Sequence, residues 1–176
     1  MVRSIFLSLI FCFSSLVIAS NGDKSATSDD LRSMLLNLKP NQIGLNKDNY
    51  PYEVFAVAME TGVPTGSYML SAIADGSTSL YFSNGGGIIG GGEHEKVREA
   101  SLYLLSGAEH FKNKTKATSS FPKPNDGEVI FYFITFNGVK SYHANEIDLG
   151  GKKDELSGLF YAAHNVITEL RNTEEK

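Results

Sequence analysis

The chain has 176 residues, a formal net charge of −4 and a single cysteine, Cys12. This length is typical of one domain, and a lone cysteine excludes disulfide pairing within the chain and cysteine-based zinc sites. The acidic balance and the absence of a basic patch argue against nucleic acid as a partner.

The first 19 residues have the layout of a secretory signal peptide. Met1–Arg3 is a short basic start, Ile5–Ile18 is an apolar run, and Val17 and Ala19 are the small residues of a cleavage site. The run is shorter than the roughly 20 residues that span a bilayer. We expect a secreted or periplasmic protein with no membrane span after cleavage near Ala19. An uncleaved N-terminal anchor is the alternative.

The first predicted element of the mature chain is an amphipathic helix. Thr27 or Ser28 fits its N-cap, acidic residues follow in the first turn, and Pro40 ends the pattern. Its apolar positions recur at helical spacing: Leu31, Met34, Leu35 and Leu38. Residues 20–27 before this helix read as a flexible tether.

Three strand-like runs come next in the chain. They cover residues 52–61, 67–74 and 78–82. Asp75-Gly76 separates the second run from the third and is a strong hairpin signal. These runs predict a meander of antiparallel strands.

The second half alternates helix and hairpin. Residues 93–112 carry one apolar face and predict a helix of about five turns. Residues 128–136 form a nearly continuous apolar run, which is typical of an interior strand, and Asn137-Gly138 predicts a turn into a strand over residues 139–145. A last helix is expected over residues 154–171.

The predicted order is therefore α-β-β-β-α-β-β-α. Hairpin connections make the sheet largely antiparallel, and we expect the three helices to cover it mostly on one face. We expect one α+β domain over residues 28–172 with a five-stranded sheet and three helices, followed by a short tail over residues 173–176.

The order of meander, long helix, hairpin and terminal helix resembles the profilin, roadblock and longin group of α+β domains. Roadblock-like domains pair through a helix or a sheet edge, so the resemblance implies a homodimer. The chain is also similar to uncharacterised bacterial proteins with no established activity. The stretches that carry this similarity are Ala74–Phe82, the glycine-rich residues from Gly85 through His94-Glu95, and Leu159–His164.

Six glycines fall within eight positions between the third strand and the second helix. Glycine loses more conformational entropy on folding than any other residue, so such a cluster needs a backbone with positive φ or a close approach. A phosphate cradle, a close-packed segment, a mobile flap and a plain turn are the four interpretations. The phosphate interpretation lacks the Gly-Lys-Ser/Thr pattern. The segment consists of Gly85, Gly86, Gly87, Ile88, Ile89, Gly90, Gly91 and Gly92.

The two isoleucines of this segment are unsuited to water. We expect Ile88 and Ile89 to enter the domain's own core, or else to insert into a ligand or partner. If they insert into a ligand or partner, the glycine segment is the predicted contact surface.

Glu93, His94 and Glu95 form the most catalytic-looking triplet, because a histidine beside carboxylates can act as a base or bind a metal. The plainer interpretation is an acidic helix start. His164 borders the buried stripe of the last helix. His94 and His164 are the two weak candidates for metal ligands. No metal or other cofactor is predicted.

These observations favour a binding or interaction module over an enzyme. Its ligand, an unknown protein or small molecule, is expected to contact the sheet edge or the glycine segment. The alternatives are a hydrolase that uses His94 with Glu93 or Glu95, and anion binding by the glycine segment.

Overall fold

The computed structural model describes residues 26–174. The predicted signal peptide, residues 1–19, and residues 20–25 of the predicted tether lie outside this range, as do residues 175 and 176. Within the described residues, no helix combines the length and the apolar character that a membrane crossing needs.

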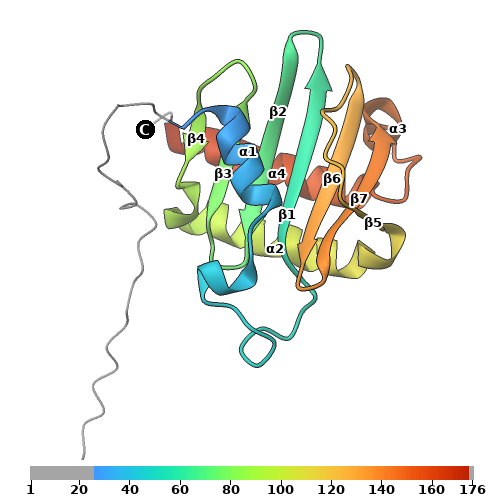
Figure 1. The fold of residues 1–176 in the computed structure, drawn as a ribbon. Helices are drawn as coiled ribbons and strands as arrows, with labels where there is room; N and C mark the ends of the chain where they lie inside the picture. The colour runs from blue at the N-terminus through green and yellow to red at the C-terminus, as the bar shows by residue number, and fades with distance from the viewer. Residues whose placement is uncertain (1–25, 175–176) are drawn as a thin grey trace, which may run out of the picture.

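One antiparallel sheet of seven strands organises the fold (Figure 1). The strand order is β4-β3-β2-β1-β6-β7-β5, so β1 and β6 lie inside the sheet and β4 and β5 form its two edges. The strands are β1 (Val54–Val63), β2 (Gly66–Ile73), β3 (Thr78–Phe82), β4 (Gly87–Ile89), β5 (Lys116–Thr118), β6 (Glu128–Thr135) and β7 (Gly138–Asn145).

Helices cover both faces of the sheet. Two long helices lie side by side behind it and the first helix crosses the opposite side, so we call these the back face and the front face (Figure 1). The α-helices are α1 (Ser28–Leu36), α2 (Glu95–Phe111), α3 (Glu146–Gly150) and α4 (Ser157–Glu174). The described residues also form three short 3₁₀ helices: η2 (Pro40–Ile43) before β1, η3 (Gly91–Glu93) before α2 and η4 (Lys112–Lys114) after α2.

The α+β class and the antiparallel sheet are confirmed, but the predicted counts of five strands and three helices are wrong. The described residues form seven strands and four α-helices. The extra strands β4 and β5 have three residues each, too few to show an alternating pattern. The extra helix α3 has five residues, and Asn145 is its N-cap, whose side chain accepts a hydrogen bond from the Ile147 N–H.

Local signals at the turns and caps are confirmed. Thr27 is the N-cap of α1, and its hydroxyl and the Asp30 carboxylate complete a capping box. The Asp75-Gly76 turn joins β2 to β3, and the Asp75 carboxylate accepts a hydrogen bond from the Ser77 N–H. At the far end, α4 continues to Glu174, so Thr173 and Glu174 of the predicted tail are helical.

The back face holds the larger core. It is formed by alternate residues of the strands and by the facing sides of α2 and α4. Leu104 of α2 and Val166 of α4 are almost inaccessible to solvent, as is Phe131 of β6. A core of this size explains how the domain is held together without disulfides.

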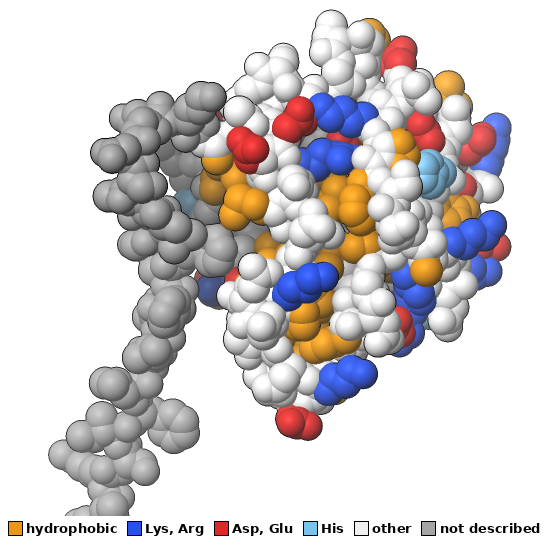
Figure 2. Space-filling model, viewed as in Figure 1, with side chains coloured by type: hydrophobic (Ala, Val, Ile, Leu, Met, Phe, Trp, Pro, Cys, Tyr) orange, Lys and Arg blue, Asp and Glu red, His pale blue; other side chains and the backbone are white. Residues whose placement is uncertain are grey.

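The front face holds a second, separate core. Here α1 contributes only Leu35 and Leu36 as buried side chains, and Tyr132 and Phe55 of the sheet are covered largely by loops. The space-filling view of this face shows hydrophobic side chains in patches between polar ones (Figure 2). The front cover is therefore thinner than the back one.

Candidate functional site

The glycine segment opens with a tight hairpin between β3 and β4. The Gly85 N–H donates to the Phe82 carbonyl at 3.0 Å, and the Phe82 N–H donates to the Gly86 carbonyl at 3.2 Å. Gly85 and Gly86 have φ values of +100° and +80°. A three-residue hairpin loop needs a left-handed backbone at its last position, which explains Gly85. Gly86 closes the loop opposite Phe82, and its own positive φ also favours glycine.

The last two glycines are required by close packing. A Cβ on Gly91 would lie 2.1 Å from Leu170 Cδ2, and one on Gly92 would lie 1.7 Å from the Gly76 carbonyl oxygen. A methyl group cannot fit at either distance, and the second neighbour is backbone, which cannot move aside. This end of the segment therefore anchors the hairpin against α4 and the β2–β3 turn.

Between the two ends lies β4, whose isoleucines have different environments. Ile88 is partly buried and packs on the back core, whereas Ile89 points to the front side and is 67% exposed. The expected insertion into the core thus describes Ile88 alone. Ile89 is a large apolar side chain left in water at the edge of the sheet.

Within residues 26–174, no strand pairs with the outer edge of β4. In an antiparallel ladder, residues alternate between those whose N–H and C=O face the neighbouring strand and those whose groups face away. The Phe82 N–H faces β4, so Leu80 and its partner Ile88 form the next hydrogen-bonded pair. Gly87 and Ile89 must then present their N–H and C=O groups outward.

The predicted catalytic triplet lies on the surface. His94 is the N-cap of α2, makes no side-chain cap hydrogen bond and is exposed, as are Glu93 and Glu95. Among residues 26–174 no three His, Cys, Asp or Glu side chains are grouped so that they could hold a metal ion. The hydrolase and the metal interpretations therefore gain no support from the geometry.

His164 lies apart from the start of α2. Gly91 packs against Leu170 in the last part of α4, and His164 is six residues earlier, about 9 Å along the helix axis. Its ring packs on Phe160 with 4.3 Å between the ring centroids, and its buried Nε2 has no hydrogen-bond partner among the described residues. Burial lowers the pKa of His164, so the neutral form is favoured.

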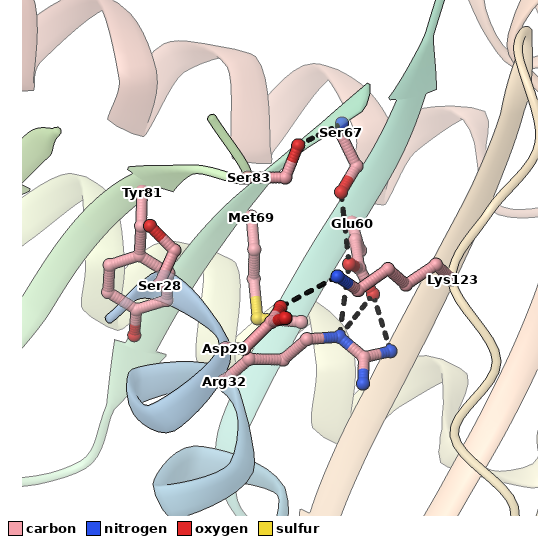
Figure 3. A pocket seen from close by; sticks show the side chains of 9 residues that line it. All are labelled: Ser28, Asp29, Arg32, Glu60, Ser67, Met69, Tyr81, Ser83 and Lys123. Atoms are coloured by element: carbon pink, nitrogen blue, oxygen red, sulfur yellow. Dashed lines mark hydrogen bonds and ion pairs between the residues drawn. The ribbon is translucent and has the colours of Figure 1, made fainter. Parts of the chain in front are cut away.

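Sequence analysis missed a buried ion pair on the front face. Arg32 of α1 reaches Glu60 of β1, with Nη2–Oε2 at 2.8 Å and Nε at 3.0 Å from both carboxylate oxygens (Figure 3). Glu60 is 1% exposed and also accepts a hydrogen bond from the Ser67 hydroxyl. The sequence signal was present: Glu60 is the single charged residue within the ten of β1.

The ion pair joins three segments of the chain. Arg32 Nη2 also donates to the carbonyl oxygens of Phe121 and Pro122, in the loop before β6. Burial alone would lower the pKa of Arg32. The hydrogen bonds and the negative charge of Glu60 outweigh burial, so the pKa of Arg32 is raised. The hollow beside the pair has a volume of about 10 Å³, enough for about one water molecule. This arrangement connects α1 to the sheet and to the loop before β6.

A second hollow lies where β6 begins and β7 ends. It is open, has a volume of about 360 Å³ and is bordered by the pair of His143 Nδ1 and Glu128 Oε1, 2.9 Å apart. The hydrogen bond with His143 lowers the pKa of Glu128. His94, Glu93, Glu95 and His164 line neither of these two hollows.

Comparison of the chain with protein-family models, with curated proteins and with solved structures finds no match. The interpretation of the site therefore depends on its own geometry.

Proposed function

We propose that the protein is an exported binding module whose contact surface is the β4 edge and the glycine turn beside it. The observation that carries the proposal is the combination of outward backbone groups at Gly87 and Ile89 with the 67% exposed side chain of Ile89. Export is proposed from the signal-peptide pattern of residues 1–19.

Charge supports the choice of this edge over the other. Folded proteins protect exposed sheet edges with charged side chains, lysine above all. Strand β5 carries Lys116 and follows Lys112 and Lys114, whereas residues 82–90 include no charged side chain. The β4 edge therefore lacks the protection that the β5 edge has.

The test compares the two edges in the cells that make the protein. A photo-cross-linking residue, p-benzoylphenylalanine, replaces Ile89 on β4 in one variant and Ala117 on β5 in the control. We expect a discrete cross-linked product from position 89 and none from position 117. No product at 89, or the same products at both positions, would contradict the proposal.

A further inference from the structure

We infer that the β4 edge binds a second copy of this chain, strand against strand, in a two-fold antiparallel pair centred on Ile88. The inference rests on the proposed function and names the partner for that surface. It is carried by the register of β4, by the sizes of its side chains and by its lack of charge.

Among the two-fold pairings of β4, the one centred on Ile88 is the pairing that places both outward residues of this strand opposite each other. Because Gly87 and Ile89 face outward, each must form a hydrogen-bonded pair with an outward residue of the other copy. Antiparallel pairing about Ile88 places Gly87 opposite Ile89 of the partner subunit, and Ile89 opposite the partner's Gly87. The result is four backbone hydrogen bonds that join two seven-stranded sheets.

Side-chain size fits the same register. The two Ile88 residues meet in the non-hydrogen-bonded position, where facing Cβ atoms are closest, on the side of the sheet where Ile88 already packs against the core. Each exposed Ile89 lies opposite a glycine, which has no Cβ to obstruct it. The sequence Gly-Ile-Ile is thus complementary to itself when reversed about its centre.

Charge does not oppose this contact. The chain carries a net charge of −4, so two copies repel weakly at long range, but residues 82–90 are uncharged and add no repulsion at the edge itself. A contact built from three residues on each side is small, so the dimer should form at high concentration and dissociate on dilution.

Light scattering on purified protein that starts at residue 20 tests the inference. From about 10 μM to about 1 mM, the weight-average mass should rise toward twice the monomer mass. Ile89→Lys should abolish the rise, whereas Ile89→Val should preserve it. Ala117→Lys, which adds the same charge to the β5 edge, should leave it unchanged. Circular dichroism confirms that each variant is folded.

Three outcomes would overturn the inference: a wild-type protein that stays monomeric, a dimer that survives Ile89→Lys, or a dimer that Ala117→Lys disrupts. The cross-linking experiment at position 89 separates this failure from failure of the proposed function. A cross-linked product that contains only this chain supports both the proposed function and the pairing with a second copy. A product with a different protein alone keeps the proposed function and rejects the second copy. The absence of any cross-linked product at position 89 rejects both the proposed function and the pairing with a second copy.

Discussion

The two faces of the sheet are covered by different means. The back face is covered by α2 and α4, of 17 and 18 residues, which bury many apolar side chains against the strands. The front face is covered by the nine residues of α1, by loop side chains and by one buried ion pair. Both faces are closed, the back one by two long helices and the front one by a short helix together with loops.

The difference shows what positions a short helix. With only Leu35 and Leu36 buried, α1 has few apolar contacts, and apolar contacts are not directional. The pair of Arg32 and Glu60 is directional and bidentate. We infer that it fixes where α1 sits on the sheet, whereas α2 and α4 are positioned mainly by extensive apolar packing. A few hydrogen bonds add to that packing, such as the one between Ser101 of α2 and Thr78 of β3.

The largest effect is expected from breaking the ion pair on one side. Arg32→Leu leaves the carboxylate of Glu60 buried without its counter-charge, which should lower the free energy of unfolding by about 3–5 kcal/mol. Chemical denaturation measures this loss. The double variant Arg32→Leu with Glu60→Leu is the control and should recover most of it. If Arg32→Leu costs less than about 1 kcal/mol, α1 is not held as we infer.

Truncation of one leucine on each face compares the two cores directly. Leu104→Ala on the back face should cost about 2–5 kcal/mol, because α2 and the strands cannot close the cavity. Leu36→Ala on the front face should cost less, since the loops around α1 can relax into the space. Equal losses in denaturation experiments would show that the front cover is as tightly packed as the back.

Acid should weaken the back face through His164. The folded-state pKa of this histidine lies below the ordinary value near 6.5, so the unfolded chain takes up the proton first. The stability that the neutral ring contributes is present above about pH 6.5, the ordinary pKa of histidine. It is lost as the pH falls from about 6.5 toward the lower pKa of the folded state. His164→Gln should have a flatter dependence of unfolding free energy on pH below about 6.5. An unchanged slope would show that other groups control it.

The smallest effect is expected from the exposed ion pair beside the buried one. Lys123 and Asp29 are 2.7 Å apart, but their side chains are 51% and 67% exposed. Lys123→Ala should therefore change the free energy of unfolding by less than about 1 kcal/mol. A loss as large as that of Arg32→Leu would mean that the whole charged cluster acts as one unit.

Much of this fold follows from local patterns in the sequence. The amphipathic periodicity of α2 and α4 predicts the back layer, and Asp75-Gly76 and Asn137-Gly138 predict two of the hairpins. Their signals are local because 3.6-residue periodicity and turn chemistry involve neighbours in the chain. Strands β4 and β5 gave no such signal, since each has only three residues.

The front face was harder to predict because its contacts join distant parts of the chain. Arg32 and Glu60 are 28 positions apart, and nothing local indicates that they meet. The glycine segment was recognised, yet its glycines have separate causes: a hairpin turn at Gly85 and close packing at Gly92. Neither cause can be assigned before the neighbouring backbone is known.

These two separate causes determine which glycines of the segment can be replaced in related sequences. Gly85, Gly86 and Gly90 need only a left-handed backbone and have open space around a Cβ, so asparagine or aspartate is a tolerable replacement there. Gly87 and Gly92 face backbone oxygens at 2.2 and 1.7 Å from a Cβ and admit no side chain. A spacing of glycines at positions 87 and 92 is therefore a better fingerprint for finding distant relatives than the glycine run as a whole.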